Sequence, residues 1–319
     1  MAPGRHDASG LALLFPGQGA QHPSMLDAVR AVPEFDARYA LVRETVGSLV
    51  IDRFERGDDV ALRSNKASSL LTILASSLAW LAWDRTSDVR PSCVAGYSVG
   101  QWTALHAAGA LDFETLVRVV STRADFMDEC MRGEPGGMYA VLGLPLEVVN
   151  DQLARLREDG HLVWVSNVNC PGNCSIAGTL TALAAAVECL AALTPKKLAP
   201  VPVSGAWHSP LLSTAADRFH DALLGIELAP TAIPIVDNVT GGWLADDPSE
   251  RRAQLARHLT SPVLWQSGMQ TCLASCRRFI ELGHGGSLTK LGFFLDRRAE
   301  FETYRPDAQL PVRPVACAG

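Results

Sequence analysis

Residues 95–105 read AGYSVGQWTAL and place Ser98 between two glycines at the end of an apolar segment. The segment 92–98, SCVAGYS, is short and apolar and predicts a buried strand, and the small apolar residues after Gly100 predict a helix. A serine at a strand-to-helix turn exposes its hydroxyl and lies beside helix N–H groups that can hold an oxyanion. Gly-x-Ser-x-Gly alone is short enough to occur by chance in a buried turn. With its flanks, it predicts an α/β fold in which Ser98 is a nucleophile.

Other segments extend this α/β pattern on both sides of the serine. The apolar run 11–15 predicts a strand that ends at PGQG, and the apolar stretch 70–83 predicts a buried helix. Residues 112–130 have the spacing of an amphipathic helix. The runs 233–239 and 278–283 predict two more buried strands. We therefore expect a large domain with a mostly parallel sheet.

The pattern changes at MRGEPGG, residues 131–137. The residues that follow predict strand, helix, strand, strand, helix and strand, which is the ferredoxin-like order. We therefore expect a ferredoxin-like α+β subdomain at 133–203, inserted into a large domain made of 1–132 and 204–319. The predicted segments are 137–144, 145–158, 162–169, 173–178, 180–193 and 196–203.

Composition excludes several classes of function. The chain has 319 residues, is 48% hydrophobic and carries a net charge of −6, without the basic run that binding to nucleic acid requires. The apolar stretch 70–83 is too short to span a membrane, and the first ten residues do not resemble a secretory signal. The eight cysteines match no zinc-site spacing and favour reduced thiols in the cytoplasm. We expect a cytoplasmic protein that binds neither nucleic acid nor membrane and holds no metal.

A nucleophilic serine needs a base, which is usually a histidine. His208, in VSGAWHSPLL, follows a predicted strand much as Ser98 does, and His284 lies in the glycine-rich segment ELGHGG. The residue pattern alone ranks these two histidines together.

Seven segments, in this order along the chain, resemble the malonyl-CoA:acyl carrier protein transacylase family. They cover residues 11 to 295 and are PGQGAQ, GYSVGQ, the arginine of STRADFM, NVNCPGNCSIAG, AWHSPLL, the PVLW of SPVLW, and FIELGHGGSLTKL. The resemblance implies an α/β-hydrolase-like large domain with a ferredoxin-like insertion, as the residue pattern does.

The resemblance also implies a role for each matching residue. Ser98 would be the nucleophile and His208 its base, and the backbone N–H groups of Gln18 and Val99 would form the oxyanion hole. The backbone carbonyl of His258 would orient the base. Arg123 would bind the free carboxylate of a malonyl group. The expected substrate-binding residues are Arg123, Trp207, Tyr97 and Met127.

Four positions depart from the family pattern. Tyr97 replaces a histidine, Gln101 a glutamate, Ala67 a glutamine and His284 a proline, so hydrogen bonding near Ser98 should differ from that of the family. The proline at the matching position also favours a structural role for His284. Trp207 stands where related enzymes often carry phenylalanine, and we expect it to disfavour methylmalonyl relative to malonyl.

The resemblance implies an acyltransferase that needs no cofactor. By a ping-pong route through an acyl-serine, it would move a malonyl group from CoA to the phosphopantetheine thiol of an acyl carrier protein. SGAWHS favours a trans-acting enzyme of polyketide synthesis over one of fatty acid synthesis. The alternatives are the transferase subunit of malonate decarboxylase, a transferase of another acyl group between carrier proteins, and an editing acyl-thioester hydrolase. We expect weak electrostatic binding of the carrier protein, with Lys196, Lys197 and Arg277 as candidates.

Overall fold

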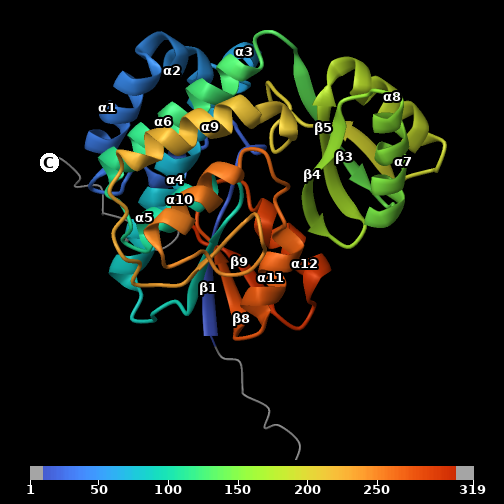
Figure 1. The fold of residues 1–319 in the computed structure, drawn as a ribbon. Helices are drawn as coiled ribbons and strands as arrows, with labels where there is room; N and C mark the ends of the chain where they lie inside the picture. Colours follow the sequence, from blue (N-terminus) through green and yellow to red (C-terminus); the bar gives the residue numbers. More distant parts are fainter. Residues whose placement is uncertain (1–9, 307–319) are drawn as a thin grey trace, which may run out of the picture.

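The computed structural model describes residues 10–306, which form two separate β-sheets, one in each lobe of Figure 1. Parallel strands make up the larger sheet and antiparallel strands the smaller one. The larger sheet contains β1 (Gly10–Phe15), β2 (Cys93–Gly96), β7 (Ile235–Val236), β8 (Cys276–Glu281) and β9 (Glu300–Thr303). The smaller sheet contains β3 (Gly136–Leu142), β4 (Val163–Cys170), β5 (Asn173–Thr179) and β6 (Lys197–Pro200).

Helices surround both sheets, and several begin at a side-chain cap that the sequence supplies. Ser64 accepts a hydrogen bond at the start of α4, and Asp112 does so at the start of α6. The α-helices are α1 (Phe35–Val46), α2 (Ser48–Glu55), α3 (Asp59–Leu62), α4 (Asn65–Thr86), α5 (Gly100–Ala107), α6 (Phe113–Cys130), α7 (Leu146–Glu158), α8 (Leu180–Ala191), α9 (Ser213–Leu224), α10 (Pro248–Arg257), α11 (Trp265–Leu273) and α12 (Ser287–Leu295). Two short 3₁₀ helices span Asp27–Val29 and Pro210–Leu212.

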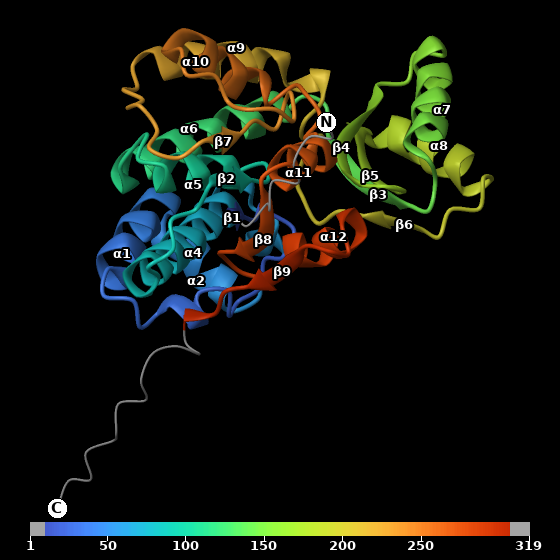
Figure 2. The ribbon, with the colours of Figure 1, turned by 90° about the horizontal axis from the view of Figure 1, so that it is seen from below.

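The strands β1, β2 and β7 of the larger sheet are buried on both faces. The strand order of this sheet is β7-β2-β1-β8-β9, and all of its pairs are parallel. Leu11, Leu13 and Phe15 of β1 pack into the core that includes α4 and α5, whereas Ala12 and Leu14 pack against α11 and α12. Figure 2 shows these two layers of helices on opposite sides of the strands. Burial on both faces explains why β1 is continuously apolar instead of alternating with polar residues.

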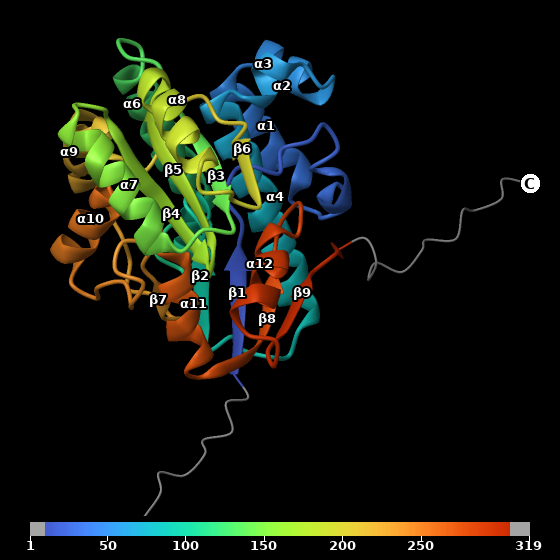
Figure 3. The same ribbon diagram turned by 90° about the vertical axis from the view of Figure 1, so that its right-hand side faces the viewer.

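The smaller sheet has the predicted ferredoxin-like topology. Its strand order is β4-β5-β3-β6, all antiparallel, and α7 and α8 cover one face, which is turned toward the viewer in Figure 3. It has its own apolar core, with Val141, Leu153 and Ile176 among the buried residues. The predicted fold class is therefore confirmed. The boundaries at 133 and 203 stay a prediction.

Two strands differ from the sequence prediction. The run 233–239 forms only the two-residue strand β7, because Pro234 lacks an N–H and the Asp237 carboxylate bonds the backbone N–H of Thr240, which turns the chain. The short edge strand β9 was not predicted. Of the helices between residues 10 and 306, none is long and apolar enough to cross a membrane.

Parallel pairing brings three loops to one edge of the larger sheet. The PGQG turn follows β1, the turn with Ser98 follows β2, and a polar pair, Asp237 and Asn238, follows β7. Because β1, β2 and β7 are neighbours and run in one direction, their carboxyl ends lie together. This edge is where α/β folds usually bind their ligands.

Candidate active site

Ser98 lies in a strained turn between β2 and α5. Its φ angle is 52°, in the left-handed region that residues other than glycine seldom adopt. The two flanking glycines permit the tight packing of this turn. A Cβ on Gly96 would lie 2.1 Å from the carbonyl carbon of Gly100, and one on Gly100 would lie 2.2 Å from the carbonyl oxygen of Phe15. The turn thus has the geometry of a nucleophile elbow.

His208 contacts this serine directly. The distance from Ser98 Oγ to His208 Nε2 is 2.7 Å, although 110 residues separate them in the chain. On the other side of the ring, Nδ1 lies 2.8 Å from the carbonyl oxygen of His258. A carbonyl can only accept, so this contact places the proton of the neutral ring on Nδ1 and leaves Nε2 free to accept the serine proton. The pair has the geometry of a nucleophile and an oriented base.

The surroundings of His208 favour its neutral form. Burial, and next the positive charge of Arg123, lower the pKa of His208 to about 3, and only the hydrogen bond to the His258 carbonyl acts in the opposite direction. The direction of this shift means that His208 stays neutral, and able to take a proton, through the whole physiological pH range.

The two expected oxyanion donors lie beside Ser98. Gly17, which precedes Gln18, packs so closely that a Cβ there would be 3.5 Å from the Ser98 Cβ. Val99 is the N-cap residue of α5, and the first N–H groups of a helix have no partner inside the helix. The side chain of Gln18 donates to oxygens of α4 on Asn65, Ser68 and Ser69, which fixes the loop. The role of the Gln18 and Val99 backbone N–H groups as donors to an oxyanion stays a prediction.

Arg123, on α6, is a buried cation that has no carboxylate partner among residues 10–306. Only 1% of its surface is exposed, and within residues 10–306 its Nε and Nη2 atoms have no hydrogen-bond acceptor. Burial lowers the pKa of Arg123 to about 10, so the group is still charged at neutral pH. An uncompensated buried charge costs about 3–5 kcal/mol. The simplest explanation for a guanidinium buried in this way is that it binds an anionic ligand. Its charge also acts on His208, so the two groups are close enough to interact.

Comparisons with known proteins agree with this geometry. The profile of the acyl transferase domain matches residues 13–284. The malonyl CoA-acyl carrier protein transacylase of Bacillus subtilis is 32% identical over 294 residues, 91% of this chain and 92% of that protein. The chain belongs to this family. The protein is therefore an acyltransferase.

Two further proteins that are similar to this chain carry polyketide synthesis in their own descriptions. The polyketide biosynthesis protein ThaF of Burkholderia thailandensis is 32% identical over 91% of this chain, although the match covers only 24% of ThaF. A malonyl-transacylase solved in complex with a type II PKS acyl-carrier protein superposes with a TM-score of 0.86 at 28% identity, covering 93% of this chain and 96% of that chain.

Two of the four residues that depart from the family pattern, Tyr97 and Gln101, make polar contacts near Ser98. The hydroxyl of Tyr97 donates to Asn169 Oδ1 on β4 at 2.7 Å, so it ties the elbow to the smaller sheet. The Gln101 amide donates to Asp237 Oδ1 at 3.4 Å and accepts from the backbone N–H of Asn238 at 3.3 Å. Ala67 is buried on α4.

Asn238 is a site residue that the sequence analysis did not identify. Its Oδ1 accepts from the backbone N–H of Ser98 at 2.8 Å, and its amide donates to the Gly96 carbonyl at 2.7 Å. These two bonds stabilise the strained turn from across the sheet. The available signal was its place at the carboxyl end of the predicted strand 233–239, where polar residues of α/β folds gather.

Two expected substrate-binding residues, Met127 and Trp207, are buried. They lie close in sequence to Arg123 and His208, respectively. Met127 is one helical turn after Arg123 on α6 and is 1% exposed. Trp207 precedes His208 and is 3% exposed, and its ring packs on Gly205, where a Cβ would lie 2.4 Å from it. Their contact with an acyl group stays a prediction.

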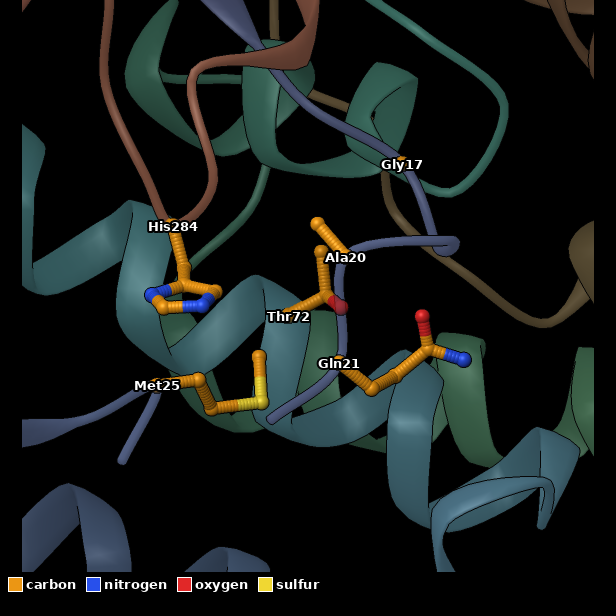
Figure 4. A pocket seen from close by; sticks show the side chains of 6 residues that line it. All are labelled: Gly17, Ala20, Gln21, Met25, Thr72 and His284. Carbon is orange, nitrogen blue, oxygen red and sulfur yellow. The ribbon is translucent and has the colours of Figure 1, made fainter. Parts of the chain in front are cut away.

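His284 packs at the loop that follows β1. It follows β8 and lines a small cavity with Gly17, Ala20, Gln21, Met25 and Thr72, as Figure 4 shows. Burial lowers the pKa of His284, but no hydrogen bond joins it to Ser98 within the described chain. The structure thus separates two histidines that the residue pattern had ranked together.

Proposed function

We propose that this acyltransferase moves a malonyl group from CoA to the phosphopantetheine thiol of an acyl carrier protein. The observation that carries the proposal is the buried cation of Arg123, whose Nε and Nη2 atoms have no acceptor in the described chain and whose charge acts on His208, the hydrogen-bond partner of Ser98. A guanidinium can hold a carboxylate by two parallel hydrogen bonds, and the malonyl group carries a free carboxylate.

The reaction follows from these positions in two half-reactions. Ser98 Oγ attacks the thioester carbon while its proton passes to His208 Nε2, and the N–H groups of Gln18 and Val99 stabilise the oxyanion. The C–S bond then breaks, and CoA leaves as a thiol with the proton from His208. The carrier thiol enters, gives its proton to His208 and attacks the acyl-serine. Ser98 recovers its proton as the C–O bond breaks.

Mass spectrometry of the intact protein tests this proposal. After mixing with malonyl-CoA, the protein should gain one malonyl group, and a phosphopantetheinylated carrier protein should then remove it and appear malonylated itself. Loss of the malonyl group to water at the same rate without a carrier would instead indicate a hydrolase. A protein that never gains the group would contradict the proposal.

Replacing Arg123 with alanine should reverse the acyl preference. We expect malonyl loading to fall about 100-fold, because truncating one partner of a buried, hydrogen-bonded charge pair costs about 2–5 kcal/mol. Loading from acetyl-CoA should persist or rise, since the unpaired charge is gone. The measurement is the single-turnover rate of acyl-enzyme formation with each donor.

Arg123→Lys is the matched control for this prediction. Lysine keeps the charge but loses the planar fork, so malonyl loading should lie between wild type and alanine. The free energy of unfolding of Arg123→Ala should not decrease greatly, because the wild-type guanidinium forms no ion pair in the described part of the chain. Wild-type protein that loads acetyl as fast as malonyl would refute the role of Arg123.

A groove between the smaller sheet and the helices α11 and α12 is the proposed approach of the carrier protein. It encloses about 930 Å³, and its lining includes Cys170 and Asn173 of the smaller sheet, Lys196, and Phe294 of α12. Asn173 accepts a hydrogen bond from Asn169, which in turn accepts from Tyr97 beside Ser98. The groove thus adjoins the candidate site.

Of the three basic residues expected to bind the carrier protein, only some lie at this groove. Lys196 lines it, and Lys197 follows as an exposed residue at the start of β6. Arg277 does not belong with them, because it lies near the beginning of β8, at the end of the strand opposite the Ser98 edge. The sequence grouped these residues only by clustering of charge.

Replacing Lys196 with glutamate should raise the KM for the carrier protein several-fold. A carrier protein is generally acidic whereas this chain is itself negative, so the attraction must be local, and it should weaken as ionic strength rises. The measurement is the transfer rate against carrier concentration at two salt concentrations. Arg90→Glu is the control, because Arg90 is exposed just before β2, at the opposite edge of the sheet. Transfer that is insensitive to salt in the wild type would contradict the idea.

We favour polyketide synthesis as the setting of this reaction. The segment around Trp207 supports it, and so does the similarity to ThaF and to the transacylase solved with a polyketide carrier protein. A cytoplasmic location accords with the use of CoA. An editing hydrolase is less favoured, because such enzymes act on varied uncharged acyl groups, which leave Arg123 unpaired.

A further inference from the structure

The side chain of His258 has a contact of its own with the catalytic pair. Its ring stacks on the ring of His208, with 4.8 Å between the ring centroids and 30° between the ring planes. This contact is separate from the hydrogen bond that the His258 backbone carbonyl accepts, which any amino acid at this position would provide.

Histidine is a costly residue at this position. His258 is fully buried, and neither Nδ1 nor Nε2 of its ring has a hydrogen-bond partner within residues 10–306. Buried polar atoms without partners destabilise a fold, and an apolar side chain of similar size would avoid that penalty. Packing alone therefore does not account for an imidazole here.

We propose that the imidazole of His258 is a positioning residue for His208: it fixes the plane of the base and stabilises the imidazolium that His208 becomes in each half-reaction. The inference rests on the proposed function, because only a proton transfer from Ser98 or the incoming thiol charges His208. The aromatic face of a neutral ring attracts a cation stacked upon it, and it excludes water from that side of the base.

The charge state of His258 is consistent with this role. The charged and titratable groups that act on it are His208 and Arg123, and burial together with both of them holds the pKa of His258 well below its ordinary value. The ring is thus neutral when His208 accepts a proton. A second imidazolium would repel the first, so neutrality is a requirement of the stacked arrangement.

The test compares His258→Leu with His258→Phe. Leucine removes the aromatic face and phenylalanine keeps it, while both remove the unpaired nitrogens and both retain the backbone carbonyl. We expect leucine to slow acyl-enzyme formation about tenfold, as loss of a desolvated cation–π contact would. KM should stay within twofold and the Tm should not fall. Phenylalanine should stay within threefold of the wild-type rate.

Two measurements make the outcome decisive. Single-turnover acylation by malonyl-CoA gives the main rate, and the burst with p-nitrophenyl acetate reports the reactivity of Ser98 without any dependence on the malonyl assignment. If the wild type gives a burst with p-nitrophenyl acetate but is not acylated by malonyl-CoA, the proposed function is refuted. The role of His258 is judged separately, from the burst rate of His258→Leu relative to that of the wild type. A leucine variant as fast as wild type, or two variants equally slow with a lowered Tm, would overturn the inference.

Discussion

Replacing Ser98 with alanine should abolish acyl-enzyme formation and lower carrier-protein acylation by about 10⁴-fold or more. The hydroxyl is the only atom of Ser98 that can hold the acyl group, and its 2.7 Å contact with His208 Nε2 provides the path for its proton. The measurement is the mass of the intact protein after mixing with malonyl-CoA, together with the steady-state transfer rate.

The variant should fold normally, which separates loss of chemistry from loss of structure. The left-handed backbone at this position costs a similar free energy for serine and for alanine, and the backbone N–H of residue 98 keeps its hydrogen bond to Asn238 Oδ1. The Tm should therefore stay within a few degrees of wild type. Ser48→Ala, at an exposed serine of α2, is the matched control. A Ser98→Ala protein that still gains the malonyl mass would rule out Ser98 as the nucleophile.

Local sequence was sufficient to predict most of the fold. The apolar run of β1 and the pattern of strands and helices from β3 to β6 are properties of neighbouring residues, and the structure follows them. The strand β7 shows the limit of such patterns. Its apolar run is long enough for a strand, but Pro234 and the turn at Asp237 leave only two residues for pairing.

The site was less accessible to local reasoning, because its contacts join distant parts of the chain. Ser98 was found from its own flanks, whereas Asn238 contacts its backbone N–H from 140 residues away and has no motif of its own. The same distance explains why His208 and His284 were not separated by pattern. Each follows a predicted strand, and only the path of the chain from β6 back to the larger sheet brings His208 to the serine.

Arg123 shows how structure adds to a resemblance. The sequence places an arginine on an amphipathic helix, where a solvated or salt-bridged side chain is the usual outcome. The family resemblance implied a carboxylate-binding role. The structure adds the physical reason to expect a ligand, because the guanidinium is buried and lacks any acidic partner in the described chain.

Replacing His208 with alanine should slow acyl-enzyme formation at least about 10³-fold, because one member of a nucleophile–base unit is lost. His284→Ala is the matched control and should stay near the wild-type rate, since Ser98 is hydrogen-bonded to His208 and, in the described chain, not to His284. The single-turnover rate with malonyl-CoA measures both variants. If His284→Ala were the more damaging of the two, His208 could not be the base.

The pH dependence of the wild type gives an independent check on the same residue. The pKa of His208 is lowered to about 3, so the neutral form that accepts the Ser98 proton is present above that pH and is lost only below it. Acylation should therefore stay nearly constant from about pH 8 down to about pH 5, where an ordinary histidine would lose most of its activity as a base. A rate that halves near pH 6.5 would indicate that the base is a solvated histidine. Because His208 is buried against the His258 carbonyl, that result would exclude His208 as the base.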